Sequence, residues 1–363
     1  MRKILIPLVL LGLVGAAAVG WLAFFGNVPA PEGDAESYSV KLPEGVTFDA
    51  AVDSLNAVGA LGSESSFRTF AGLTGWGDQV KTGHYVLEPG MSNWAMLDKI
   101  RKGLVDPIRI TIPGGLTPER FGRVLQRELG VDSAEVVAAV TAPDLAEQLG
   151  TDTAHLLGRM RANTYDIKWT QDARRAVSRI HEWHERYWTD EKVAQAQALG
   201  MTPDEVITMA SIVQWEALKP EERPAIAGVY LNRLLGRTSS GTMRLQADPT
   251  VQYALMESDG GGMRRLLFKD YAFPHPYNTY QIDGLPPGPI NNPSDDAIEA
   301  VLAGGEKHDY LYFVADGSGG HDFSSTVAEH NAKARRWSAW LSEQMRIKRQ
   351  REAAEASGAD AAP

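Results

Sequence analysis

The chain has 363 residues, of which 44% are hydrophobic and 23% are charged. This length allows one large domain or two to three small ones, and the ordinary composition excludes collagen-like, disordered and disulfide-scaffold classes. The net charge of −10 argues against a broad nucleic-acid-binding surface, which needs clustered Lys and Arg. The absence of cysteine excludes disulfides, Cys-ligated zinc, iron–sulfur clusters and thiol nucleophiles.

The N-terminus departs from this average composition. Arg2 and Lys3 precede Ile4–Phe25, a run of 22 residues without a charge, and acidic residues follow it. A helix of that length spans roughly 33 Å, about one bilayer core. Residues 1–26 therefore predict a single-pass anchor in the cell inner (cytoplasmic) membrane, with the remaining chain extracytoplasmic. The alternative is a signal peptide cleaved near Ala16–Ala18.

Residues 27–37 contain two prolines and three acidic residues, a composition that predicts a linker. Residues 38–104 begin with the segment Val40–Thr47, which resembles Ile110–Thr117 further along the chain. Both segments predict a short strand, a Pro-containing turn and a helix. A strand over 83–87 and a helix over about 93–102 follow. The resulting β-α-α-β pattern resembles a LysM-type module.

Downstream, residues 105–345 alternate between helical and irregular patterns. We expect residues 132–199 to be mostly helical, with Asn163–Tyr165 in a loop. Two helices over 202–235 and a helix over 248–256 should follow. The remaining predicted elements are an irregular segment over 274–293, a strand over 310–314 and a helical stretch over 326–348. The predicted fold class is α+β, with a transmembrane helix, a LysM-like β-α-α-β module and a mixed α/β domain. The Ala-rich and acidic tail, residues 346–363, is expected to be disordered.

One acidic residue stands out at the end of an apolar helix. Thr202 and Glu205 form a capping box, and the helix that it begins is apolar nearly all round up to Glu216. Glu216 shares its face with Met209, Ile212 and Val213. Because desolvation raises a carboxyl pKa, Glu216 is a candidate general acid. The structural alternative is an ion pair with a basic neighbour such as Arg223 or Arg233.

Polar and aromatic residues on the following loops suit sugar recognition, through hydrogen bonds to hydroxyl and amide groups and through stacking. The candidate substrate-binding residues are Asn232, Gln246, Asp248, Thr250, Tyr277, Asn278 and Tyr280. Asp248 has an alternative interpretation as a helix N-cap, with Pro249 at the first helical position. The Pro- and Gly-rich stretch over 284–289 is interpreted as a structural turn.

Several long motifs occur in one order along the chain. They are Ala210–Glu216, Arg223–Leu234, Leu245–Val251, Tyr277–Tyr280, Gly284–Ile290, Tyr310–Val314, Gly320–Phe323 and His330–Asn331. Together they resemble the YceG-like family of endolytic murein transglycosylases. The resemblance implies a membrane-anchored lyase that cuts nascent peptidoglycan strands between MurNAc and GlcNAc with formation of 1,6-anhydro-MurNAc ends, with Glu216 as the catalytic residue. It also implies membrane-bound peptidoglycan synthases as partners and no cofactor or metal.

The chain departs from the family pattern at two positions. Gln214 stands where the family usually has a second acid, and Gly114 stands where it often has Glu, which is expected to weaken a contact between the LysM-like and catalytic parts. Two alternatives remain open: a muramidase-type hydrolase with Asp248 as second carboxylate, and a non-catalytic peptidoglycan-binding scaffold. The His181–Glu185 segment lacks the spacing of a zinc motif and is interpreted as part of an amphipathic helix.

Overall fold

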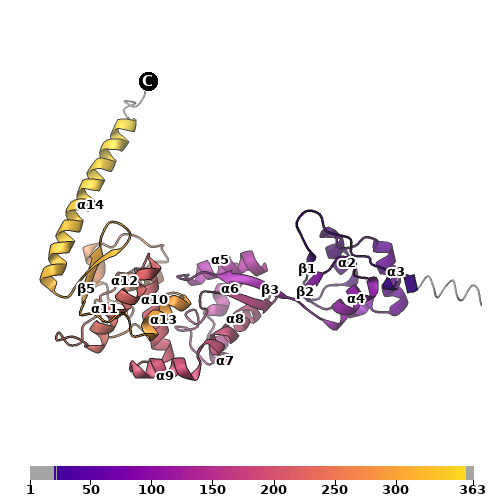
Figure 1. The fold of residues 1–363 in the computed structure, drawn as a ribbon, viewed down its shortest axis with the longest axis horizontal. Helices are drawn as coiled ribbons and strands as arrows, with labels where there is room; N and C mark the ends of the chain where they lie inside the picture. Colours follow the sequence, from indigo (N-terminus) through magenta and orange to yellow (C-terminus); the bar gives the residue numbers. More distant parts are fainter. Residues whose placement is uncertain (1–19, 22, 357–363) are drawn as a thin grey trace, which may run out of the picture. The chain divides into compact units, whose positions relative to one another are not determined.

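The computed structural model describes residues 20, 21 and 23–356 (Figure 1). Its strands are β1 (Tyr38–Leu42), β2 (Gly83–Leu87), β3 (Pro107–Ile112), β4 (Asn163–Lys168), β5 (Tyr312–Ala315) and β6 (His321–Ser324), paired as β1-β2, β3-β4 and β5-β6. Its helices are α2 (Phe48–Ala57), α3 (Glu64–Thr74), α4 (Asn93–Lys102), α5 (Pro118–Leu129), α6 (Ser133–Val140), α7 (Pro143–Gln148), α8 (Ala173–Tyr187), α9 (Asp190–Ala198), α10 (Pro203–Glu216), α11 (Arg223–Leu235), α12 (Asp248–Asp259), α13 (Asp295–Leu302) and α14 (Val327–Ala356). Short 3-10 turns are η1 (Gly77–Gln79), η2 (Pro220–Glu222) and η3 (Phe268–Ala272).

The chain forms two compact units. Unit 1 comprises residues through Thr111, Gly122–Val136 and Thr164–Ile180, and unit 2 comprises Ile112–Phe121, Val137–Asn163 and the residues from His181 onward. Most of the predicted anchor, residues 1–19 and 22, lies outside the described residues. Among the helices that the structure describes, none is long and apolar enough to span a bilayer.

The first part of unit 1 confirms the predicted β-α-α-β order. β1 and β2 pair antiparallel, with Tyr38 opposite Leu87 and Leu42 opposite Gly83, and α2 and α3 connect them. β2 and α4 have the predicted bounds. Inward-facing side chains of both strands meet the apolar faces of the helices, and this core includes Val40, Leu42, Val52, Leu55, Phe67, Phe70, Tyr85, Leu87, Met96, Leu97 and Ile100.

The start of the predicted linker belongs to this module. Val28 is buried, and the Asn27 side chain donates to Asn93 Oδ1 at 2.7 Å and accepts from the Ser63 amide at 2.7 Å. Residues 27 and 28 are therefore packed rather than extended from the module. The sequence prediction differs here because proline and acidic residues dominate the composition of the segment, whereas the hydrogen bonds of the half-buried Asn27 amide determine its position.

The predicted internal repeat is confirmed as two strand–turn–helix segments. β1 leads through a Pro-containing turn to α2, and β3 leads through a second one to α5. Each turn places a glycine in the left-handed region, Gly45 at φ +73° and Gly115 at φ +78°. A residue with a Cβ is strained there, which explains glycine at this point of both segments. The threonines that follow, Thr47 and Thr117, each accept a hydrogen bond from the first helical turn.

Two sequence predictions were wrong in this part of the fold and at the C-terminus. Asn163–Tyr165 lies in β4 rather than in a loop; Tyr165 faces inward, and Thr164 and Asp166 meet Thr111 and Arg109 of β3. The helix α14 continues to Ala356, so residues 346–356 of the expected disordered tail are helical. Arg and Lys side chains of this segment pair with Glu three and four residues away, which supports the helix.

Unit 2 is organised around α10, which packs against α11, α12 and α13 (Figure 1). The predicted capping box begins the helix, since Thr202 and Glu205 bond each other's backbone amides. From Val206 to Val213 every residue of α10 is buried. The core also includes Ile226, Tyr230, Leu231, Leu245, Ala254, Ile290, Ile298 and Val301. A helix buried on all sides gives its last residue a defined position.

A buried amide connects three segments of unit 2. Asn292 is fully buried; its Nδ2 donates to the Pro113 and Met160 carbonyls at 2.9 Å, and its Oδ1 accepts from the Leu116 amide at 2.7 Å. Next to it, Ser294 donates to Gln214 Oε1 on α10 at 2.6 Å. The turn before α5 is thus held to the loop that precedes α13.

We expect Asn292→Ala to lower the stability of unit 2, because it leaves the buried Met160 carbonyl and the buried Leu116 amide without this partner, at about 1–3 kcal/mol each. Calorimetry should show a melting temperature reduced by several degrees. Asn331→Ala, at an exposed position on α14, is the control and should melt like the parent protein. Equal melting temperatures for both variants would contradict this role of Asn292.

Candidate active site

Glu216 is the last residue of α10, and one oxygen of its carboxyl group is shielded from water. The Oε2 atom is closed to solvent and has no hydrogen-bond partner among the described residues. The buried Tyr230 hydroxyl of α11 donates a hydrogen bond to the carboxyl group. The chain turns into extended backbone at Ala217, so α10 ends directly after this side chain.

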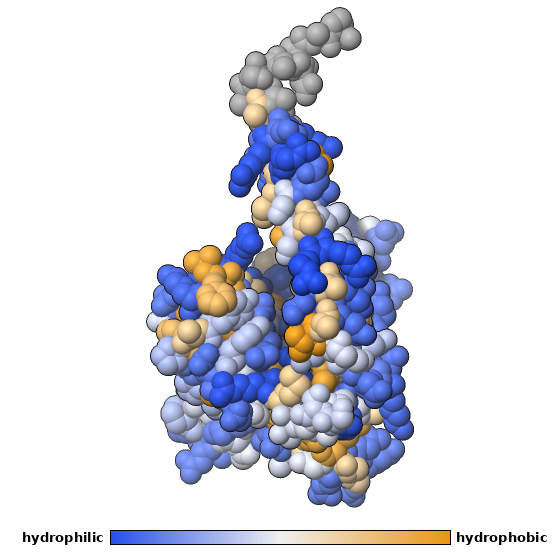
Figure 2. All heavy atoms as spheres, turned by 90° about the vertical axis from the view of Figure 1, so that its left-hand side faces the viewer, coloured by the Kyte–Doolittle hydropathy of each residue, from blue (hydrophilic) through white to orange (hydrophobic). Residues whose placement is uncertain are grey.

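The carboxyl group of Glu216 lines a cavity of about 560 Å³ in unit 2. The other lining residues come from α11, the start of α12, η3, the loops on either side of them, β5, β6 and α14: Arg233, Gln246, Asp248, Tyr271, Tyr280, Tyr312, Phe313, Val314, Ala315, His321, His330 and Trp337. The lining is therefore rich in aromatic and polar groups. The end of the molecule that carries α14 is largely hydrophilic and is hollowed (Figure 2).

Asp248 is the second carboxyl group of the cavity. The Tyr280 hydroxyl donates to its Oδ1 at 2.7 Å and the Tyr271 hydroxyl donates to its Oδ2 at 3.3 Å. The two tyrosine rings lie 4.6 Å apart. Asp248 is the first residue of α12 and makes no side-chain cap, so its interpretation as an N-cap is wrong. Its carboxylate lines the cavity instead.

The neighbouring Gln246 adopts a strained backbone. Its φ of +49° is the only positive value of a non-glycine residue in the described part of the chain. Such a conformation costs about 1–3 kcal/mol and persists only where the surroundings impose it. Here Thr279 imposes it: its carbonyl accepts from the Gln246 amide at 3.2 Å and its hydroxyl accepts from the Ala247 amide at 2.9 Å.

Burial raises the pKa of Glu216 to about 8, and the negative charge of Asp248 adds to the effect. The hydrogen bond from Tyr230 and the charge of Arg233 act in the opposite direction and do not overcome it. Burial also raises the pKa of Tyr271 to about 12, so its hydroxyl remains a donor to Asp248. At neutral pH the cavity therefore holds a protonated Glu216 close to a second carboxyl group that accepts hydrogen bonds.

The expected ion-pair alternative for Glu216 is not found among the described residues. Arg223 pairs with Asp296. Arg233 lines the cavity, but it donates to the Leu311 carbonyl at 2.7 Å and to the Leu245 carbonyl. Both guanidinium groups are thus occupied elsewhere, which leaves Glu216 without a salt bridge.

The structure brings together four of the eight predicted site residues: Glu216, Gln246, Asp248 and Tyr280 line one cavity. The other four are buried beside it. Asn232 donates to the His308 and Tyr310 carbonyls, Asn278 donates to the Phe273 carbonyl, Thr250 bonds Thr279, and Tyr277 packs on Tyr253. Their polar groups hold the loops that carry the cavity residues.

Sequence reasoning missed the C-terminal wall of the cavity. Tyr312, His321, His330 and Trp337 all line it, although they are far from Glu216 in the chain. Glu222 orients His321: it accepts from the ring Nδ1 at 2.7 Å and from the backbone amide at 3.0 Å. The family-like motifs around His321 and His330 were the available signal.

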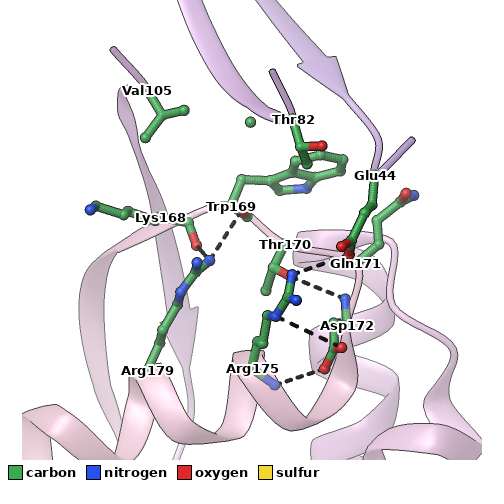
Figure 3. Close-up of a pocket in the computed structure, with 11 residues that line it drawn as sticks. Glu44, Thr82, Val105, Lys168, Trp169, Thr170, Gln171, Asp172, Arg175 and Arg179 are labelled. Carbon is green, nitrogen blue, oxygen red and sulfur yellow. Dashed lines mark hydrogen bonds and ion pairs between the residues drawn. The ribbon is translucent and has the colours of Figure 1, made fainter. Parts of the chain in front are cut away.

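Unit 1 contains a second cavity, of about 340 Å³, lined in part by Lys168, Trp169, Arg175 and Arg179 (Figure 3). Its arginines are engaged within the lining, since Arg175 pairs with Glu44 at 3.1 Å and Arg179 donates to the Trp169 carbonyl. Of its two carboxylates, Glu44 is largely exposed and Asp172 is half-buried. The cavity of Glu216 is therefore the better candidate for acid–base chemistry.

A carboxyl group whose pKa is raised in the folded state loses stabilising free energy as the pH rises from its unfolded value through the folded value. For Glu216 this interval runs from 4.5 to about 8. We expect the melting temperature of Glu216→Gln to rise relative to that of the parent protein as the pH increases across that interval. Below and above the interval, the difference between the two melting temperatures should be constant. Glu221→Gln, at an exposed position, is the control. A difference independent of pH would contradict the raised pKa.

Comparisons with known proteins identify the family to which the chain belongs. The model of the YceG-like family matches residues 40–336. An endolytic murein transglycosylase of Bacillus subtilis (strain 168) is 28% identical over 84% of this chain and 85% of its own length. One of Streptococcus pneumoniae (strain D39) is 28% identical over 80% of this chain, which spans only 58% of that protein. A YceG-like crystal structure from Listeria monocytogenes aligns with 82% of this chain and 98% of its own, at 28% identity and a TM-score of 0.54. This chain belongs to the YceG-like family.

Proposed function

We propose that this chain is a lytic transglycosylase that cleaves the MurNAc–GlcNAc bonds of peptidoglycan strands. The observation that carries the proposal is Glu216, a single desolvated carboxyl group of raised pKa beside Asp248, which two tyrosine hydroxyls engage. Family membership and the names of the relatives support the same reaction class.

In the proposed reaction Glu216 first acts as general acid. It donates its proton to the glycosidic oxygen while the bond from that oxygen to C1 of MurNAc breaks. Positive charge develops at C1, and the Asp248 carboxylate stabilises it electrostatically. Tyr230 then stabilises the Glu216 carboxylate through its hydrogen bond.

In the second step Glu216 acts as general base. Its carboxylate takes the proton of the MurNAc 6-hydroxyl, and the oxygen bonds to C1 to close the 1,6-anhydro ring. The proton that Glu216 gave to the leaving oxygen is thereby replaced, and no water is consumed. One carboxyl group therefore serves both steps, and no second carboxylate has to activate water.

The hydrolase alternative assigns that task to Asp248. Its carboxylate already accepts hydrogen bonds from Tyr271 and Tyr280. Both oxygens of the Asp248 carboxylate are therefore already engaged by a hydroxyl group. This arrangement suits a carboxylate that faces the sugar better than one that has to orient and deprotonate a water molecule.

We also propose that Ile4–Phe25 anchors the chain in the cytoplasmic membrane, with the active site outside and close to the synthases that produce new strands. The support is the charge-free run after Arg2 and Lys3. A tether of this kind would favour cleavage of nascent strands over digestion of mature wall.

We expect purified protein to release fragments with 1,6-anhydro-MurNAc ends from uncross-linked glycan strands, as read by mass spectrometry. Glu216→Gln should lower kcat by about 10²–10⁴, the contribution of a general acid–base group. Products with reducing ends alone would favour the hydrolase, and binding without turnover by the parent protein would favour the scaffold. Full activity of Glu216→Gln would contradict the site assignment.

Asp248→Asn tests the second carboxyl group. Because the charge of Asp248 raises the pKa of Glu216, its removal should move the alkaline decline of kcat to lower pH. It should also lower kcat, since less charge faces the transition state. Asp259→Asn, at the exposed end of the same helix, is the control. An unchanged pH profile for Asp248→Asn would show that the two carboxyl groups do not interact.

A further inference from the structure

Aromatic side chains form a stripe along one face of α14. His330, Trp337 and Trp340 are separated by seven and three residues, spacings that place them on the same side of a helix. From His330 to Trp340 the helix rises about 15 Å. The stripe is therefore long enough to contact more than one sugar ring.

The stripe begins inside the cavity of Glu216. His330 and Trp337 line that cavity, and the His330 ring packs on the Tyr312 ring with centroids 5.4 Å apart. Trp337 and Trp340 then stack on each other, with ring centroids 4.9 Å apart and an angle of 20° between the planes. Trp340 is 45% exposed, so the stripe ends on the open surface.

The loop between β5 and β6 supports the two indoles. Gly317 has a φ of +88°, and a Cβ there would lie 3.2 Å from Trp337 and 3.4 Å from Trp340. Asp316 holds this loop by accepting from the Ser318 amide at 2.7 Å and the Gly320 amide at 3.0 Å. The indole pair is thus backed by a tight turn, which makes it a preorganised surface for a ligand.

We propose that Trp337 and Trp340 form a glycan subsite that continues the active-site cavity along α14 and binds the strand beyond the bond that is cut. The inference rests on the proposed function. The C–H face of a sugar ring is apolar and packs flat on an indole, whereas its hydroxyl groups stay in water. An elongated strand leaving the cavity would meet Trp337 first and Trp340 next.

The test compares long and short substrates. Trp340→Ala should raise KM for long uncross-linked glycan strands about two- to tenfold, the factor that an aromatic stacking energy of about 0.5–1.5 kcal/mol gives. It should leave kcat unchanged, and it should leave KM unchanged for the shortest strand that is cleaved. Trp340→Tyr should restore most of the affinity. Met345→Ala, at an exposed position on another side of α14, is the matched control.

An unchanged KM for long strands would overturn the subsite, and so would an equal rise of KM for long and short strands, which would indicate a structural role. Equilibrium binding of the same long strands to Glu216→Gln, with and without Trp340→Ala, separates this inference from the proposed reaction. Weaker binding of the double variant supports the subsite even if the parent protein releases no anhydro product. Equal binding contradicts it.

Discussion

The removal of one carboxyl group from water is the interaction on which the rest of this structure depends. Glu216 ends a helix that is buried on all sides, and the fold places it where ionisation is unfavourable. The residues around Glu216 leave its protonated carboxyl group available for proton transfer. Tyr230 donates to the carboxyl group, Asp248 lies in the same cavity, and the nearby arginines are engaged elsewhere. An acid without a salt bridge can give and take a proton.

Many polar side chains are buried in unit 2 because they hold the loops that support the cavity. Thr250 and Thr279 hold the strained segment at Gln246, Asn278 holds the loop at Phe273, and Asn292 holds the turn before α5. The two departures from the family pattern also meet here: a Cβ at Gly114 would lie 3.2 Å from the Gln214 side chain. Gln214 faces this turn and does not line the cavity. Its neutral side chain accordingly leaves Glu216 as the acid, and the contact of Gly114 lies within unit 2.

Short sequence patterns predicted the helices and strands whose ends depend on residues close by in the chain. The capping box at Thr202 predicted the start of α10, and strand β2 and helix α4 have the expected bounds. β4 was missed because its partner β3 lies some fifty residues earlier in the chain, and pairing at that distance leaves no local pattern. Among the site residues, Asp248 and Tyr280 reach the cavity, whereas Asn232 and Asn278 serve backbone carbonyls. An amide that binds substrate and an amide that holds a loop are identical in sequence, and only the fold separates them.

Glu216 stays protonated at neutral pH because it is desolvated. A direct measurement is the titration of its carboxyl carbon by NMR in protein labelled with 13C-glutamate, with Glu216→Gln used to assign the signal. We expect a midpoint at about 8, shifted to lower pH in Asp248→Asn. A midpoint near the ordinary glutamate value, unchanged in that variant, would contradict it.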